Sequence, residues 1–175
     1  RVGSTQCLDC PIGKSSATSG SSRCDTCPPG TYSASQAASI CMACQTGKWS
    51  ADHGASSAAT CIACAPGRYS PNAGAYSNST CVECVAGRWA SAGGGTSSDD
   101  CMKCAKGKYS ASSGETSSET CKECVAGQYA PSEAMEECVD CPAGAWGDQR
   151  GASACNQCPE GSYSSEEGAT SPATC

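Results

Sequence analysis

The apolar positions of this chain are sparse and follow no helical period. Gly, Ser and Pro interrupt every stretch, and apolar residues do not recur at helical spacing beyond one turn. A short Gly-x-(Tyr/Trp)-(Ser/Ala) segment recurs instead, which predicts a short strand, and a Ser- and Gly-rich tail follows it, which predicts a turn. We therefore expect small irregular β-hairpin loops and no helices.

Each predicted strand belongs to a repeat that opens with a Cys-x-x-Cys pair. Successive repeats are 17 or 20 residues long, and the long ones read Gly-x-x-Ser before the next pair. A period of this kind indicates a linear array in which each repeat contacts its neighbours. We expect one continuous array over residues 1–175, without an internal domain boundary and as a fragment of a longer chain. Its nine repeats start at Cys7, Cys24, Cys41, Cys61, Cys81, Cys101, Cys121, Cys138 and Cys155.

Composition excludes an ordinary hydrophobic core. Only nine residues are Leu, Ile or Val, Phe is absent, and 19 residues are Cys. Cross-links must therefore replace the core, and such cysteine use is typical of secreted or cell-surface proteins. The predicted fold class is small and disulfide-rich: an elongated linear array of short irregular β-hairpin loops with no single hydrophobic core.

The cysteine spacing allows two disulfide patterns. In the pattern that we expect, the second Cys of each pair closes a loop onto the first Cys of the next pair, worth about 3 kcal/mol per loop in a chain-entropy model. Cys7 is then left for a residue or chain not present. In the alternative, repeats interleave in twos, as Cys7–Cys24 with Cys10–Cys27. The expected bonds are Cys10–Cys24, Cys27–Cys41, Cys44–Cys61, Cys64–Cys81, Cys84–Cys101, Cys104–Cys121, Cys124–Cys138, Cys141–Cys155 and Cys158–Cys175.

Zinc is the rival use of Cys-x-x-Cys pairs at this spacing. Nine pairs do not divide evenly into four-ligand sites, and the Ser/Thr-rich context is typical of extracellular chains. We expect no metal and no cofactor.

Two further positions recur and are expected to be structural. A Gly follows each pair, where we expect positive φ or a close backbone approach against the adjacent disulfide. An aromatic residue follows two positions later in eight repeats and is expected to cover a disulfide. The glycines are Gly13, Gly30, Gly47, Gly67, Gly87, Gly107, Gly127, Gly144 and Gly161. The aromatic residues are Tyr32, Trp49, Tyr69, Trp89, Tyr109, Tyr129, Trp146 and Tyr163.

Charged positions recur as well. A cation separates the Gly from the aromatic position in several repeats, and acidic residues recur before the second Cys. A solvated face explains this ladder most simply, and contact with a partner is the alternative. Candidate contact residues are Arg68, Arg88 and Tyr76, a tyrosine outside the repeat pattern. The net charge of −6 argues against nucleic acid as a partner.

The chain offers little for catalysis or membrane insertion. His53 is the only histidine, and no apolar run approaches the length of a membrane span. We expect a non-enzymatic structural protein: a glycosylated rod that forms a stalk or the subunit of an extracellular fibre. Its partners would be copies of itself or neighbouring array segments, with covalent glycans at Asn78 and on the Ser/Thr tails. The alternative is a receptor or adhesin ectodomain that binds a protein or glycan along the rod.

Two segments carry a resemblance to known families. Cys27-Pro-Pro-Gly-Thr-Tyr-Ser, closing at Cys41, resembles the first loop of tumour necrosis factor receptor cysteine-rich modules. Cys158-Pro-Glu-Gly-Ser-Tyr-Ser, with Gly168-Ala-Thr-Ser and Cys175, is closer to ephrin-receptor-like cysteine-rich repeats. The resemblance implies the loop pairing given above, an elongated ladder of disulfide-bonded units and an extracellular location. Long arrays of such repeats resemble those in large surface proteins of single-celled eukaryotes.

Overall fold

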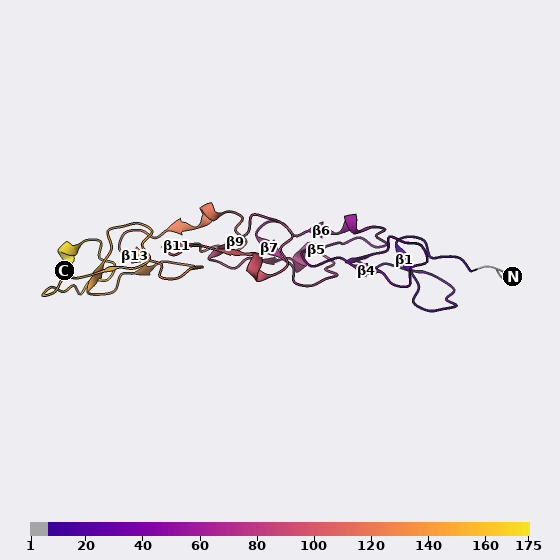
Figure 1. The fold of residues 1–175 in the computed structure, drawn as a ribbon, viewed down its shortest axis with the longest axis horizontal. Helices are drawn as coiled ribbons and strands as arrows, with labels where there is room; N and C mark the ends of the chain where they lie inside the picture. The colour runs from indigo at the N-terminus through magenta and orange to yellow at the C-terminus, as the bar shows by residue number, and fades with distance from the viewer. Residues whose placement is uncertain (1–6) are drawn as a thin grey trace. The chain divides into compact units, whose positions relative to one another are not determined.

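The computed structural model describes residues 7–175 and divides the chain into two compact units. Unit 1 comprises residues 1–65, 69–82 and 93–97, and unit 2 comprises residues 66–68, 83–92 and 98–175. Each unit is a succession of small loops with very little regular secondary structure (Figure 1). The described residues include no α-helix, and none of their helical turns has the length and hydropathy that a membrane span requires.

The regular structure consists of eight two-stranded sheets, each made of two-residue strands that are adjacent in sequence. The registers place the residue between Gly and the aromatic position opposite the residue before the second Cys of the next pair, as in Lys108↔Glu123. The paired strands are β1 (Lys14–Ser15) with β2 (Asp25–Thr26), β3 (Thr31–Tyr32) with β4 (Met42–Ala43), β5 (Lys48–Trp49) with β6 (Ile62–Ala63), β7 (Arg68–Tyr69) with β8 (Val82–Glu83), β9 (Arg88–Trp89) with β10 (Met102–Lys103), β11 (Lys108–Tyr109) with β12 (Lys122–Glu123), β13 (Gln128–Tyr129) with β14 (Val139–Asp140), and β15 (Ala145–Trp146) with β16 (Asn156–Gln157).

Nine disulfides close the loops. Each one joins the second Cys of a pair to the first Cys of the next pair, from Cys10–Cys24 to Cys158–Cys175, with sequence separations of 14 or 17 residues. Cys7 is exposed and makes no disulfide with any residue that the structure describes. The interleaved alternative is not the pattern in this structure.

The buried interior consists of cysteines and small residues. The largest fully buried side chains include Cys27, Cys44, Cys64 and Cys84, and the residue after the aromatic position is buried as Ser, Ala or, after Trp146, Gly. Ser50 and Ala130 are two examples of that position. The aromatic residues, which we expected to cover disulfides, are half-buried in seven repeats and exposed at Tyr163, so they are not among the buried residues.

Backbone hydrogen bonds reach beyond the nearest neighbour. Within unit 1, the Gly30 N–H donates to the Ser50 carbonyl of the next repeat at 2.7 Å, and the Gly54 N–H donates to the Cys27 carbonyl at 2.8 Å. A Cβ added at Gly30 would lie 2.7 Å from the carbonyl carbon of Gly74, which is two repeats further along the chain. Most loops therefore contact two following repeats, whereas the sequence pattern predicted contact with immediate neighbours; Gly144 and Gly161 have no such distant neighbour.

The long repeats end in single 3-10 turns that the sequence pattern did not predict. At the four turns that begin at Ala58, Asn78, Ser118 and Pro172, a Ser hydroxyl accepts the N–H two residues on, as Ser57 does from Ala59 at 3.2 Å. A Thr hydroxyl closes these four turns by donating back to that Ser carbonyl, as Thr60 does at 2.8 Å. The turns are η1 (Ala58–Thr60), η2 (Asn78–Thr80), η3 (Ser98–Asp100), η4 (Ser118–Thr120) and η5 (Pro172–Thr174).

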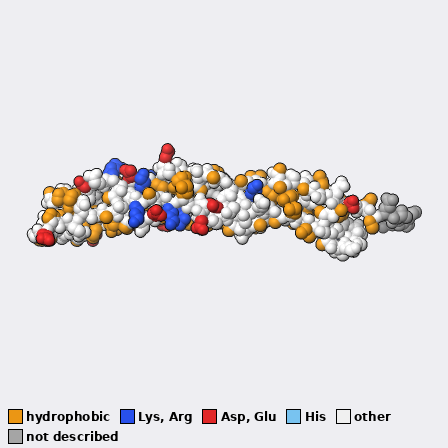
Figure 2. Space-filling view, viewed as in Figure 1, with side chains coloured by type: hydrophobic (Ala, Val, Ile, Leu, Met, Phe, Trp, Pro, Cys, Tyr) orange, Lys and Arg blue, Asp and Glu red, His pale blue; other side chains and the backbone are white. Residues whose placement is uncertain are grey.

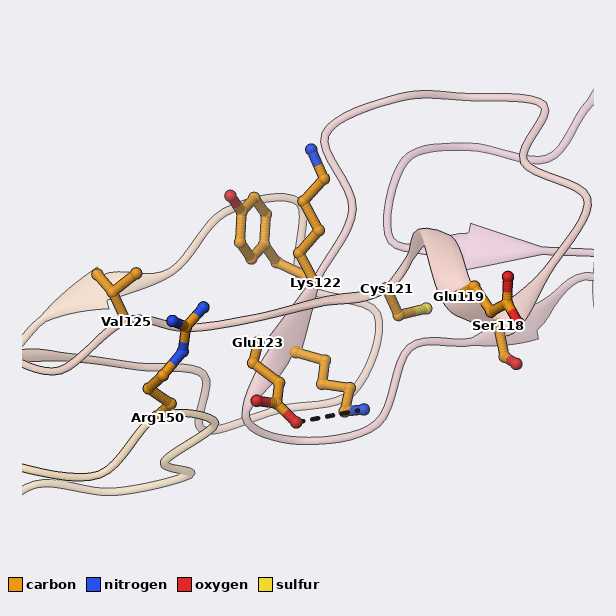
Figure 3. A pocket seen from close by; sticks show the side chains of 9 residues that line it. Ser118, Glu119, Cys121, Lys122, Glu123, Val125 and Arg150 are labelled. Carbon is orange, nitrogen blue, oxygen red and sulfur yellow. Dashed lines mark ion pairs between the residues drawn. The ribbon is translucent and has the colours of Figure 1, made fainter.

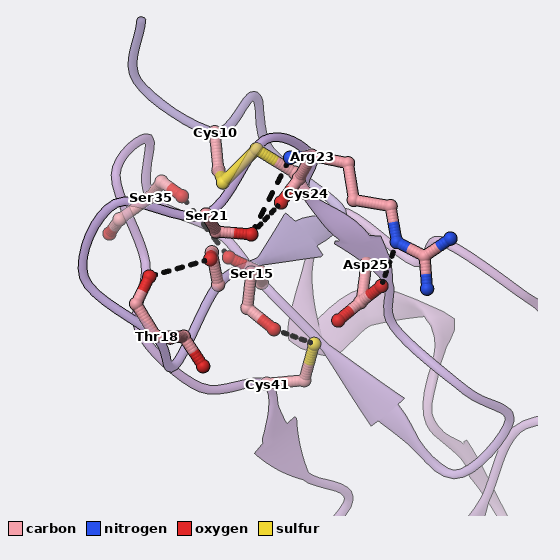
Figure 4. The surroundings of a disulfide bond; sticks show 11 residues. Cys10, Ser15, Thr18, Ser21, Arg23, Cys24, Asp25, Ser35 and Cys41 are labelled. Atoms are coloured by element: carbon pink, nitrogen blue, oxygen red, sulfur yellow. Dashed lines mark hydrogen bonds and ion pairs between the residues drawn. A yellow bond between two sulfur atoms is a disulfide. The ribbon is translucent and has the colours of Figure 1, made fainter. Parts of the chain in front are cut away.

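Repeat 1, where Ser15 replaces the aromatic residue, shows what the aromatic position faces. The Ser15 hydroxyl lies 3.2 Å from Cys41 Sγ, a sulfur of the following loop's disulfide (Figure 4). The aromatic position of this repeat therefore lies next to a disulfide of the loop that follows it.

Candidate functional site

The recurring cations and acids are partners across the two-residue hairpins. Arg68 Nη2 lies 2.5 Å from Glu83 Oε1, and Lys108 Nζ lies 3.7 Å from Glu123 Oε1. Both pairs are partly exposed and belong to unit 2. Directly opposed opposite charges are a favourable cross-strand arrangement. Sequence reasoning noticed both positions but treated them as separate features, because the register that joins them was unknown.

Glu83 is the centre of the best-connected of these pairs. Ser113 Oγ donates to Glu83 Oε2 at 2.9 Å, while Arg68 donates to the other carboxylate oxygen. The hydrogen bond from Ser113, followed by the hydrogen bond and positive charge of Arg68, holds the pKa of Glu83 below its ordinary value of 4.5. This carboxylate is therefore an anion with fixed partners and is unsuited to proton transfer near neutral pH.

Arg88, the second arginine proposed as a contact residue, is also engaged. Its Nη1 donates to the Cys101 carbonyl at 3.1 Å and to the Ser98 carbonyl at 3.4 Å. Lys103 stands opposite Arg88 in the hairpin and pairs instead with Glu133 at 3.8 Å. Partner binding by Arg68 and Arg88 remains a prediction. Both guanidinium groups would have to bind the partner while they keep their hydrogen bonds within the chain.

The aromatic residues occupy one structural position and differ in exposure. Seven of the eight lie half-buried in the first strand of a hairpin, and the backbone of most of them is bridged to the tail of the following repeat, as Trp49 is to Ala75. Tyr163 is 82% exposed and lies outside any strand. Tyr76, the candidate contact residue outside the repeat pattern, is 63% exposed.

The glycine after each Cys pair has the expected positive φ. Its close neighbour, however, is not the adjacent disulfide that we expected. Gly67 has a φ of 76°, and a Cβ added there would overlap the Gly114 carbonyl, with the carbonyl carbon at 2.7 Å. The close approach is thus to backbone two repeats further along, and not to the adjacent disulfide. Nothing in the sequence of a single repeat signals this distant contact.

Asn78, the expected glycosylation site, begins the turn η2 and is exposed. The Thr80 hydroxyl of its Asn-x-Thr motif donates to the Ser77 carbonyl at 2.6 Å. The asparagine amide therefore has room for a glycan, and glycosylation there stays a prediction.

No group of three or more His, Cys, Asp or Glu side chains in residues 7–175 is arranged to hold a metal ion. The paired cysteines are committed to disulfides, so their sulfurs are not thiolate ligands. The remaining features with binding chemistry are exposed cations, exposed rings and surface hydroxyl groups.

The second part of the chain matches a known family of repeats. Residues 107–154 and 127–175 each match the family model described as tyrosine-protein kinase ephrin type A/B receptor-like. No curated protein matches the chain. The resemblance to ephrin-receptor-like cysteine-rich repeats is thereby confirmed over residues 107–175. These are disulfide-rich repeats of an extracellular type, and the repeat family is non-catalytic in this form.

Proposed function

We propose that this chain is one continuous tandem array of nine repeats that serves as a non-enzymatic structural element of the cell surface or extracellular space. In this proposal it is a disulfide-stapled rod, either a stalk or the subunit of a fibre, and its partners are copies of itself or neighbouring array segments. The extracellular type of the matched repeats supports the location.

One observation carries the proposal: the same backbone hydrogen bonds recur from repeat to repeat among residues 7–175. The N–H of the Gly after the pair donates to the following repeat in both units, as Gly47 does to Ser70 and Gly107 does to Ala130. An enzyme needs one place that differs from the rest, whereas a repeat array buries its surfaces by stacking alike neighbours. The proposed structural role therefore depends on the stacking of similar repeats and not on a single site.

Glycans would suit such a role. The tails are rich in exposed Ser and Thr, and Asn78 is exposed. We propose covalent glycans at Asn78 and on the tail hydroxyls. Mass spectrometry of the natural protein with and without Asn78→Gln should show the loss of one N-linked glycan; an unmodified Asn78 peptide would contradict the assignment.

Imaging of the natural assembly by negative-stain electron microscopy tests the structural role. We expect thin stalks or filaments whose length grows with the number of repeats. A compact globular particle, or a lone monomer with a dedicated soluble ligand, would contradict it.

The exposure of Tyr76 favours one alternative, a receptor or adhesin ectodomain that binds a protein or glycan. An exposed aromatic ring outside the repeat pattern is suited to partner contact. Alanine at Tyr76, with Arg68→Ala and Arg88→Ala as companions, should then weaken binding to a measured partner. Unchanged affinity in all three variants would remove this alternative.

A further inference from the structure

Unit 2 has an open depression of about 670 Å³ beside the hairpin of β11 and β12 (Figure 3). This volume lies within the range of about 300–1,000 Å³ that is typical of ligand sites. Its walls come from that hairpin, from the turn η4 and from two later positions. The lining residues are Lys108, Tyr109, Ser118, Glu119, Cys121, Lys122, Glu123, Val125 and Arg150.

Two cations at this depression have no partner. Lys108 is engaged with Glu123, whereas the side chains of Lys122 and Arg150 form no ion pair or hydrogen bond with any residue that the structure describes. Both side chains are exposed, and they extend on different sides of β12 (Figure 3). The lining carries three cations and two carboxylates, and the unpaired arginine and lysine among them favour an anionic ligand. Since the two cations lie apart, a ligand that reaches both must be extended.

The rest of the lining suits sugar rings. Tyr109 is the cross-strand neighbour of Lys122, and its half-buried ring together with Val125 supplies an apolar surface for the C–H face of a sugar. Ser118, Glu119 and Glu123 offer oxygen acceptors for hydroxyl donors. An acidic peptide brings carboxylates but few hydroxyl donors, so it would leave these oxygen acceptors largely unmatched.

We propose that this depression binds an acidic oligosaccharide, a chain of sugar rings that carry carboxylate or sulfate groups. Arg150 and Lys122 hold two of the anionic groups, and the Tyr109 ring and Val125 receive the ring faces between them. The site goes beyond the structural role proposed above and does not depend on it, because it requires only that unit 2 be folded.

The test uses the full chain and a tetrasaccharide of alternating glucuronic acid and N-acetylglucosamine, titrated at low ionic strength. We expect saturable NMR shifts at Lys122, Val125 and Arg150, with a Kd on the order of 1 mM or tighter. Arg150→Gln should weaken binding about tenfold, and Lys122→Gln combined with it should abolish measurable binding. Lys106→Gln is the matched control, because Lys106 is an exposed cation of the same unit outside the depression. It should leave the affinity within about twofold.

Four results would overturn the proposal. Saturable shifts of the unmodified chain that are confined to other residues would place binding elsewhere. An equal loss on Lys106→Gln would reduce the effect to general charge attraction. Equal binding of neutral N-acetylglucosamine tetrasaccharide would remove the role of the cations. Equal or tighter binding of hexaglutamate would assign the site to acidic peptides.

Discussion

Unit 1 carries four Lys or Arg and three Asp or Glu, a net charge of +1, whereas unit 2 carries seven and fourteen, a net charge of −7. Figure 2 shows charged side chains mainly over unit 2 and mostly uncharged or apolar ones over unit 1. Seven large apolar side chains are exposed in unit 1: Leu8, Ile12, Ile40, Met42, Ile62, Tyr76 and Val82.

The backbone of the two units is nevertheless built alike. Unit 1 has four disulfides and unit 2 has five, all closing loops of the same kind. Two units with such different surfaces can share a fold only if the surface contributes little to it. Cross-links, buried small residues and backbone hydrogen bonds therefore specify the loops, and the exposed positions are free to vary.

The largest effect should come from reducing the disulfides. We expect both units to unfold, because each loop loses about 3 kcal/mol of constraint in the chain-entropy model and no core remains to replace it. Hydrogen exchange at Gly47 and Gly107, with and without a reductant, would report on the two units separately. Protection that survives reduction in unit 2 alone would show that the ion pairs of unit 2 hold its fold, and would contradict a stabilisation by disulfides that the two units share.

Substitution of the close-approach glycines should be the next largest effect, and equal in both units. Gly47→Ala and Gly67→Ala each place a Cβ against a carbonyl, with the Gly94 and Gly114 carbonyl carbons at 2.9 and 2.7 Å. We expect each to cost about 3 kcal/mol or more, measured by local hydrogen exchange.

Gly144→Ala is the matched control for these two variants. Gly144 has a similar φ of 79° but no atom within 4 Å of the added Cβ. Only the cost of a left-handed alanine remains, about 1–2 kcal/mol. If Gly144→Ala were as damaging as the other two, backbone conformation alone would explain the glycines, and the two-repeat contact would have no energetic role.

Acidification should have a smaller effect on stability, and one that is specific to unit 2. The pKa of Glu83 is lowered in the folded state, so its stabilising contribution is present above its ordinary pKa of 4.5 and is lost as the pH falls through the lower, folded value. Unit 2 should lose local stability on acidification below about pH 4.5, and Glu83→Gln should flatten that dependence. Local hydrogen exchange between pH 5 and pH 3 measures it. A profile unchanged by Glu83→Gln would mean that the Ser113 and Arg68 contacts do not form in solution.

The smallest expected effect is an increase in local stability. Ala37 in unit 1 and Ala134 in unit 2 have φ of 56° and 60° at a tail position where the other tails have Gly. Ala37→Gly and Ala134→Gly should each stabilise the local loop by roughly 1 kcal/mol or less, since relief of the left-handed alanine is partly offset by the flexibility of unfolded glycine. A loss of stability in either variant would contradict the shared tail geometry.

Much of this fold could be predicted from one repeat. The absence of apolar periodicity predicted loops, and two-residue strands lie at the Gly-x-aromatic segment, as at Lys108–Tyr109. The family resemblance, carried by residues such as Cys158 and Cys175, is confirmed by the matches to residues 107–175. These features are local, and the sequence records local constraints directly.

The features that sequence reasoning missed depend on register or on distant repeats. The partnership of Arg68 with Glu83 needs the hairpin register, and the approach of Gly67 to Gly114 joins repeats that are not adjacent. Arg150 drew no notice because it lies outside the recurring pattern. One signal was available: Ser-x-x-Thr before the closing Cys, as in Ser57 to Thr60, is a capping pattern that could have predicted the 3-10 turns.

The central claim is that loops closed between successive cysteine pairs specify this fold. Mass-spectrometric mapping of the disulfides in the natural, non-reduced protein tests it most directly. The account predicts nine bonds of one kind, from Cys10–Cys24 to Cys158–Cys175. Interleaved bonds such as Cys7–Cys24 with Cys10–Cys27, or free thiols at the paired positions, would contradict it.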